Sequence, residues 1–268
     1  MAGAYQTGIY RNVLKECGYE ETAITERLEQ TFETIFYGTE AERFYHEAGD
    51  DMAYLEDTGN HDVRTEGMSY GMMVCVQLNK KAEFDRLWKW VRTYMYIPEG
   101  PCRNYFAWSC STDGTHNAEG PAPDGEEYFA MALFFASARW GDGEGIFAYS
   151  KEAKAILREC IHKGEPGHPG EPMWEPSNHL IKFVTNMDFL TPRIICHIFM
   201  NCSQKMRRKE TGNSGDRQRQ PAENICIRHA TRRQDFLQNM QTMTGHLMQD
   251  IRKSSEGMTG TTAMHTAP

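Results

Sequence analysis

The chain has 268 residues, 40% of them hydrophobic, and a formal net charge of -8 at pH 7. Such a length allows one large domain or two small ones with a substantial core. The negative charge disfavours a nucleic-acid-binding protein, and no apolar run reaches the roughly 18 residues of a membrane span. The N-terminal sequence MAGAYQTGIYRN lacks the basic and apolar regions of a signal peptide. We therefore expect a cytoplasmic protein with neither nucleic acid nor membrane as a partner.

Charge is distributed unevenly along the chain. Residues 190–268 contain 12 Lys and Arg against 6 Asp and Glu, whereas residues 1–189 contain 17 against 31. Every Trp and Tyr also lies before Phe189. We therefore expect two segments of different origin, 1–189 and 190–268, of which the second is a poorly ordered basic tail.

Helical periodicity dominates the first segment. A short helix is expected from Tyr10 to Cys17, and a longer one follows, with Thr22 as its N-cap and Gly38 after its end. Further helices are expected over residues 67–78, 80–97 and 125–140, and another from Ser150, as N-cap, to Gly164. No stretch alternates persuasively with a period of two, so the predicted fold class is all-α.

The predicted helices are of two kinds that alternate along the chain. Those over residues 67–78 and 128–138 are apolar nearly all round, whereas those over residues 23–36, 84–95 and 153–161 carry one apolar stripe. Alternating inner and outer helices are expected for a toroid of helical hairpins, in which loops at one end carry the chemistry. The proline-rich segment 164–178 is expected to be a long ordered loop.

The stretch DVRTEGMSYGMM, Asp62 to Met73, places Glu66 where a loop enters a helix. A carboxyl group among apolar and aromatic residues has a raised pKa and can act as a general acid near neutral pH. A position in the first helical turn favours the ionised form instead, so the sequence leaves the balance open. Alternatively, Glu66 only stabilises the start of the helix. Gly67 and Gly71, one turn apart, would let another backbone approach closely.

A second acidic loop, in DGTHNAEGPAPDGEEYFAMALFFASARW from Asp113 to Trp140, also leads into an apolar helix. Asp124 is a candidate for substrate contact. However, Asp-Gly-Glu-Glu also fits a capping box in which Asp124 is the N-cap and Glu127 the reciprocal residue. Trp108, in YFAWS, could stack on a sugar ring or equally well belong to the core.

Other functional classes lack their signatures. The eight cysteines form no CxxC pair, and we interpret them as reduced structural thiols rather than disulfides or metal ligands. Because no histidine pair has metal-ligand spacing on one helix, we expect no metal and no cofactor. The GxSxG, Walker and GxGxxG motifs are absent, which disfavours nucleophilic hydrolases, kinases and dehydrogenases.

Three segments, HDVRTEGMSYGMM, YFAWSC and DGTHNAEGPAPDGEEYFAMALFFASARWGDG, resemble family 8 glycoside hydrolases, and within that family the reducing-end xylose-releasing exo-oligoxylanases. The likeness runs from about Gly3 to Phe189. It implies the N-terminal part of an (α/α)6 barrel and hydrolysis of β-1,4-xylo-oligosaccharides with inversion, releasing xylose from the reducing end. It also implies that Glu66 is the general acid and that Trp108 and Asp124 line the subsite for the sugar whose bond is cut.

An inverting enzyme also requires a general base, and at this residue the sequence departs from the family pattern. The resemblance places it in a Tyr-Ser-Asp-Ala-Tyr-Arg segment that does not occur here. We hypothesise that one base is missing near the Phe189 codon. If so, codons that encode DFLTPRIICHIFMNC can also be read in a neighbouring frame as F(S/T)DPAYHLPHFYEL. Codons that encode EGMTGTTAMHTAP can likewise be read as RNDWYYSDAYRT, and both segments are family-like. The general base is therefore not encoded in this frame, because its Asp falls across the codons of Ala263 and Met264.

A second interpretation treats the tail as a genuine regulatory or nucleic-acid-binding arm, with its Arg-rich runs MRRKE and ATRRQ. Few aromatic side chains accompany these runs, so we favour the frameshift. The frameshift predicts that only half of the closed ring of helices is present. Such a protein should be unstable, because inner helices such as residues 128–138 would expose apolar surface. The chain would be a glycosidase by family that is disabled here, or alternatively a non-catalytic carbohydrate-binding or interaction protein with a basic tail. The sequence does not indicate an oligomeric state.

We expect the source DNA to lack one base near the Phe189 codon, relative to the genes of related enzymes. Resequencing this region from an independent sample tests the expectation. A frame that encodes residues 190–268 as they are written would contradict it, and the basic tail would then need an explanation as a genuine arm.

Overall fold

The computed structural model describes residues 12–175 and 181–185. Contacts divide the chain into two compact units, Met1–Arg207 and Arg208–Pro268, and the second lies wholly outside the described residues. The boundary expected after Phe189, and the order expected of the tail, also lie outside them.

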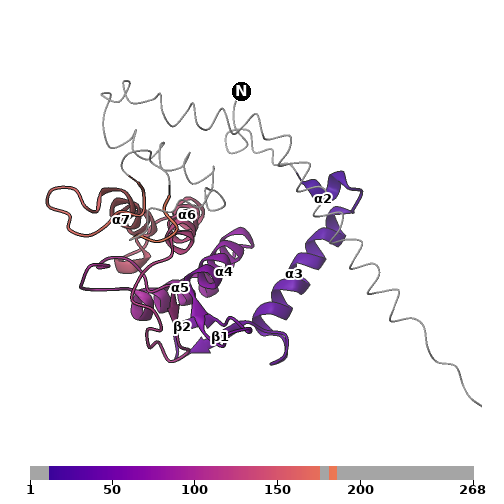
Figure 1. Ribbon diagram of the computed structural model, residues 1–268. Coiled ribbons are helices and arrows are strands. Elements are labelled where there is room, and N and C mark those ends of the chain that lie inside the picture. Colours follow the sequence, from indigo (N-terminus) through magenta and orange to yellow (C-terminus); the bar gives the residue numbers. More distant parts are fainter. Residues whose placement is uncertain (1–11, 176–180, 186–268) are drawn as a thin grey trace, which may run out of the picture. The chain divides into compact units, whose positions relative to one another are not determined.

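Helices are the main regular elements in the described part of the first unit (Figure 1). The predicted helical fold class is confirmed, and none of these helices is long and apolar enough to span a membrane. The helices are α2 (Val13–Glu16), α3 (Glu21–Tyr37), α4 (Thr65–Gln77), α5 (Lys81–Trp90) with its π-helical continuation η1 (Val91–Met95), α6 (Pro123–Trp140), the 3-10 helix η2 (Gly145–Phe147) and α7 (Tyr149–His162).

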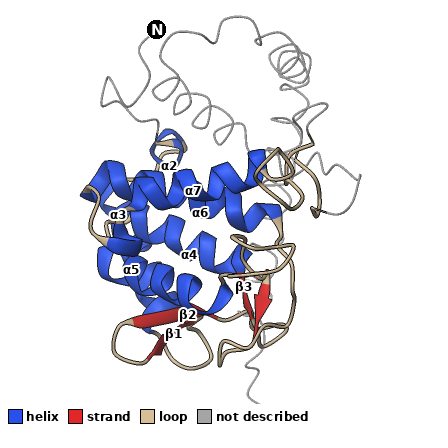
Figure 2. Ribbon diagram, turned by 90° about the vertical axis from the view of Figure 1, so that its left-hand side faces the viewer, coloured by secondary structure: helices blue, strands red, loops and turns tan. Residues whose placement is uncertain are grey.

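Four short strands add to the helices, and the sequence did not predict them. Strand β1 (Tyr45–Ala48) pairs antiparallel with β2 (Met52–Leu55), and β3 (Val63–Arg64) pairs antiparallel with β4 (Ser109–Cys110). Strands of two to four residues are too short for a period of two to stand out in the sequence. The β1–β2 hairpin lies beside α5, which packs against β2 (Figure 2).

Four helices pack side by side in the order α5, α4, α6 and α7, since α4 contacts α5 and α6, and α6 contacts α7. Apolar exposure was expected on the inner helix over residues 128–138, but Ala138 is the only apolar residue of that segment that is exposed. Phe129, Leu133 and Ala136 of α6 are fully buried or nearly so, because α6 has a helix on either side. Exposed apolar side chains lie instead on α4, at Tyr70 and Val74.

The outer helices bury one side each, as their apolar stripes predict. In α3 the rings of Phe32 and Phe36 stack with centroids 4.0 Å apart, and Phe36 packs against Tyr45 of β1. Leu28 belongs to the same predicted stripe but is 46% exposed. The stripe of α3 is therefore only partly covered within the described residues.

Two predicted N-caps are wrong. Helix α3 begins at Glu21 with Glu20 as its N-cap, and α7 begins at Tyr149 with Ala148 as its N-cap. Thr22 and Ser150 therefore lie inside the first turn of each helix. The carboxylate of Asp142, in the preceding loop, accepts hydrogen bonds from the backbone N–H and hydroxyl of Ser150 at 2.8 and 2.6 Å. An acceptor from outside the helix thus takes over the capping function.

The proline-rich segment contains no helix over residues 164–175, and its last three predicted residues lie outside the described part. Five cysteines within the described residues are free thiols: Cys17, Cys75, Cys102, Cys110 and Cys160. Of these, Cys75, Cys110 and Cys160 are buried, as a structural interpretation requires.

The two glycines of α4 have different surroundings. A Cβ atom at Gly71 would lie 2.0 Å from Cδ1 of Leu55 and 3.2 Å from Cδ1 of Leu87, whereas one at Gly67 would meet nothing within 4 Å. Gly71 therefore permits the close packing of α4 against β2 and α5. The predicted close approach applies to Gly71, where the neighbours are side chains rather than another backbone.

Gly71→Ala should lower the free energy of unfolding by about 1–3 kcal/mol, because the buried Leu55 side chain must move. Gly67→Ala is the matched control in the same helix and should raise it by about 0.5–1 kcal/mol, since alanine costs less backbone entropy there. Urea denaturation of both variants measures the two effects. Equal effects of the two substitutions would contradict the packing described for α4.

Candidate functional site

Glu66 lies in the first turn of α4, and its side chain is exposed. The hydroxyl group of Tyr70, one turn further along, donates to Oε1 of Glu66 at 3.2 Å. The apolar hollow expected around this carboxyl group is not present among the described residues. Helix α4 buries its other sides through residues such as Met68 and Met72, so Glu66, Tyr70 and Val74 form an exposed stripe.

Trp108 directly precedes strand β4, and the pairing of β4 with β3 brings it to the start of α4. Ser109 is paired with Arg64 in the β3–β4 ladder, and the backbone N–H of Thr65 donates to the carbonyl oxygen of Trp108 at 3.0 Å. The N–H of Trp108 donates to the carbonyl oxygen of Gly120 at the same distance. The side chain of Trp108 is 39% exposed, which removes the interpretation of Trp108 as a core residue.

A glycine lies where the N-termini of α4 and α6 meet. A Cβ atom at Gly125 would lie 2.4 Å from both Cβ and Oγ1 of Thr65, so only glycine allows the two helices to come this close. Asp124 is the neighbour of Gly125, and Glu66 is the neighbour of Thr65. The contact between the helices therefore brings the two acidic residues into the same region.

The charges of these two residues interact. Asp124 is half-buried, and burial together with the negative charge of Glu66 raises the pKa of its carboxyl group. Trp108 adjoins the same helix start through its bond to Thr65. The structure thus gathers the three residues selected from the sequence, Glu66, Trp108 and Asp124, around Thr65.

Tyr70 is a further residue of this site that the sequence analysis did not select. Its ring meets that of Tyr128 edge to face, with centroids 5.1 Å apart, which ties α4 to α6. Partial burial and the neighbouring Glu66 raise the pKa of Tyr70 to about 12, so the hydroxyl group keeps its proton and remains a donor. The four-residue spacing between Glu66 and Tyr70 could have revealed this pair, because such residues share a helix face.

The capping box predicted for α6 is wrong. Ala122 is the N-cap and makes no side-chain hydrogen bond, and the first helical residue is Pro123, which suits that position. Asp124 therefore lies within the first turn, where its Oδ1 atom accepts from the N–H of Gly125 at 3.0 Å. Glu127 is 2% exposed, and neither of its carboxyl oxygens has a hydrogen-bond partner among the described residues.

A second buried acid precedes Glu127 in α6. Glu126 is fully buried, and its Oε1 atom accepts from the backbone N–H of Phe106 at 3.0 Å, which links α6 to the YFAWS segment. Burial raises the pKa of Glu126 to about 8. Burial, with the charges of Asp124 and Glu126, raises the pKa of Glu127 to about 9. Both carboxyl groups are therefore protonated and uncharged at neutral pH.

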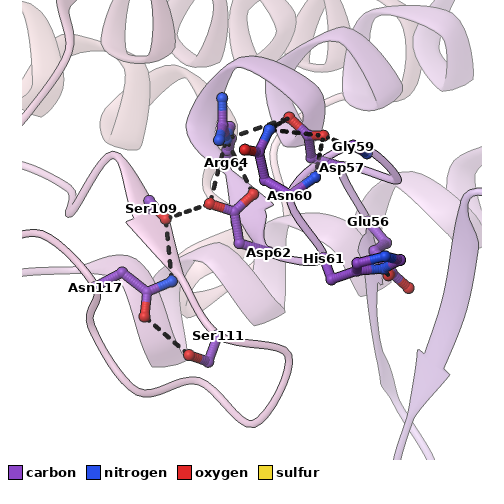
Figure 3. Close-up of polar contacts among 10 residues, drawn as sticks. All are labelled: Glu56, Asp57, Gly59, Asn60, His61, Asp62, Arg64, Ser109, Ser111 and Asn117. Atoms are coloured by element: carbon purple, nitrogen blue, oxygen red, sulfur yellow. Dashed lines mark hydrogen bonds and ion pairs between the residues drawn. The ribbon is translucent and has the colours of Figure 1, made fainter.

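The segment before α4 contains a polar network centred on Arg64 (Figure 3). The guanidinium group of Arg64 forms ion pairs with Asp57 and Asp62, and Ser109 donates a hydrogen bond to Asp62. The same guanidinium group lies over the ring of Trp108, with 5.4 Å between Cζ and the ring centroid. This network connects the loop before α4 with the exposed indole of the site.

The arrangement suits recognition of a carbohydrate. An exposed carboxylate can supply one of the two carboxyl groups of glycoside hydrolysis, a second acid nearby can bind sugar hydroxyl groups, and an exposed flat ring can stack on a sugar. Within the described residues, no group of three or more His, Cys, Asp and Glu side chains gathers as a metal site would need.

Residues 37–207 match the model of glycosyl hydrolases family 8, so the match continues past Phe189. The chain is 57% identical, over 190 residues, to the reducing-end xylose-releasing exo-oligoxylanase Rex8A of Paenibacillus barcinonensis. That alignment covers 71% of this chain and 50% of Rex8A. The corresponding enzyme of Halalkalibacterium halodurans is 56% identical over 191 residues, with 71% and 49% covered.

The solved structures agree with these relatives. The structure of Rex8A from Paenibacillus barcinonensis in complex with xylose matches with a TM-score of 0.73 and 54% sequence identity. The match covers 76% of this chain and 54% of that one. The chain thus spans about half the length of the curated relatives it matches.

Glu127→Gln should stabilise the protein increasingly as the pH rises from 6 to 8. In the unfolded chain Glu127 loses its proton near its usual pKa of 4.5, whereas the folded protein retains the proton up to about 9. Folded-state stability therefore falls with rising pH across this window, by up to about 1.4 kcal/mol per pH unit for this group.

Thermal unfolding of both proteins at pH 6, 7 and 8 measures this difference. Glu26→Gln, at an exposed position of α3, is the control and should leave the pH dependence unchanged. A stability difference between Glu127→Gln and the unsubstituted chain that is constant with pH would show that Glu127 is ionised in the folded protein.

Proposed function

Because the chain belongs to glycoside hydrolase family 8, we propose that it descends from an enzyme that hydrolyses β-1,4-xylo-oligosaccharides with inversion and releases xylose from the reducing end. The proposal rests on the exo-oligoxylanases to which it is similar. The observation that carries it is the gathering of Glu66, Asp124 and Trp108 around the contact between Thr65 and Gly125.

Each of the three residues has a proposed role. Glu66 is the general acid, which protonates the glycosidic oxygen as the bond to the anomeric carbon breaks. Its exposed position leaves room for a sugar, and the hydroxyl group of Tyr70 orients its carboxyl group. Trp108 stacks on a sugar ring through its exposed face, and Asp124 accepts hydrogen bonds from sugar hydroxyl groups.

Inversion also requires a general base, roughly 6.5–9.5 Å from the acid, that activates a water molecule on the opposite face of the sugar. We propose that this frame does not encode the base, because one DNA base is missing near the Phe189 codon. The family segment expected to carry the base is absent from the sequence. The chain as translated would then bind xylo-oligosaccharides weakly and hydrolyse them hardly at all.

The second candidate is a non-catalytic carbohydrate-binding or interaction protein with a basic tail. The exposure of Trp108 favours it, because stacking on a sugar needs no general base. The two candidates share the binding residues and differ in whether restoring the reading frame restores catalysis.

Xylotriose separates these possibilities. The chain as translated should bind xylotriose and release xylose at a rate far below that of full-length relatives, while the frame-restored protein should release it at a comparable rate. In the frame-restored protein, Glu66→Gln should lower kcat at least 100-fold, since general acid catalysis contributes about 100- to 10,000-fold. High-performance anion-exchange chromatography of the products measures release.

Glu21→Gln provides the control, because Glu21 is also an exposed first-turn acid but lies in α3. It should leave kcat unchanged. Release of xylose by the chain as translated at the rate of full-length relatives would refute the proposed loss of the general base. Failure of the frame-restored protein to release xylose would favour the binding protein.

A further inference from the structure

Arg64 is held by two carboxylates through a single nitrogen atom. Its Nε atom donates to Oδ1 of Asp62 at 2.9 Å and lies 3.2 Å from Oδ2 of Asp57 (Figure 3). The side chain of Arg64 is 28% exposed and that of Asp62 only 12%. An ion pair shielded in this way keeps one geometry better than a fully exposed pair.

Both carboxylates are themselves held in place. Ser109, which is 1% exposed, donates from its hydroxyl group to Oδ2 of Asp62 at 2.7 Å, and Asn117 donates from Nδ2 to the Ser109 hydroxyl at 3.1 Å. Oδ1 of Asp57 accepts from the backbone N–H groups of Gly59 and Asn60 at 2.9 and 3.1 Å. The rotation of the Arg64 guanidinium group is therefore restricted by two carboxylates, of which Asp57 is held within its own loop and Asp62 by Ser109.

The guanidinium group so fixed lies over the indole of Trp108, with 5.4 Å between Cζ and the ring centroid. A guanidinium group over an aromatic face attracts the ring electrostatically. The Trp108 backbone is also fixed, by its bonds to Thr65 and Gly120. The Trp108 side chain is 39% exposed, so few other contacts within the described residues limit the movement of its ring. The contact with Arg64 restricts that movement.

We propose that Arg64 is a positioning residue, which holds the Trp108 indole ready to stack on a sugar ring, and that Asp57 and Asp62 keep Arg64 in place for this task. An exposed side chain that must be ordered when a ligand binds weakens the affinity. Ordering the indole beforehand should strengthen sugar binding about two- to tenfold. The sugar itself rests on the proposed function, whereas the order of the indole does not.

The experiment uses the full chain with ¹⁵N-labelled tryptophan. Loss of one indole N–H signal in Trp108→Phe identifies the Trp108 resonance, and the heteronuclear NOE of that signal reports the order of the ring. In the unsubstituted chain the ring should be ordered. Arg64→Gln should make it mobile, and Arg64→Lys, which keeps the charge but loses the planar group, should give an intermediate value.

Two further variants keep the result interpretable. Asp62→Asn retains the shape of the side chain and should also loosen the ring, which covers the case in which Arg64→Gln does not fold. Arg86→Gln is the matched control, because Arg86 pairs with Glu47 away from this network and should leave the Trp108 signal unchanged.

Titration with xylotriose provides the second readout. Arg64→Gln should raise Kd about two- to tenfold, and Arg64→Lys should recover part of the loss. Unchanged ring order in both Arg64→Gln and Asp62→Asn would overturn the proposal. If no protein binds xylotriose, the proposed function fails while the ring order still decides the role of Arg64.

Discussion

The close contact of Thr65 with Gly125 is the constraint on which the site depends. Because glycine has no Cβ atom, the N-termini of α4 and α6 can lie against each other, and Glu66 and Asp124 come with them. Burial raises the pKa of Asp124, and the negative charge of Glu66 raises it further because the two acidic side chains repel each other. Both occupy first helical turns, where the positive ends of two helix dipoles partly offset this repulsion.

The segment that carries Trp108 is joined to both of these helices. Its Phe106 N–H reaches the buried carboxyl group of Glu126 in α6, and its Trp108 carbonyl oxygen accepts from the first residue of α4. The uncharged state of Glu126 reduces the cost of burying this acid. The aromatic ring of the site is therefore placed by backbone hydrogen bonds, while Arg64 acts only on the ring itself.

The contacts that build this site are confined to a short part of the chain. Residues 57–128 supply the proposed general acid, the stacking ring and the network around Arg64. Under the proposed function the general base would come from a much later segment. Catalysis would then need that later segment as well, whereas binding would not, so that a chain without the base could still recognise a sugar.

The sequence alone determined the helices, the position of Glu66 at a helix start and the family, because periodicity and motifs depend on residues near one another in the chain. Only the tertiary structure decided what each acidic residue experiences. Asp124 and Glu127 fitted a capping box by spacing, yet the helix starts earlier, at Pro123, and Glu127 is buried with no hydrogen-bond partner in the part of the chain that the structure describes. Glu66 and Trp108 are exposed because other elements cover the opposite sides of α4 and of the segment that leads into β4. Burial results from contacts between distant segments, and local residue patterns do not encode those contacts.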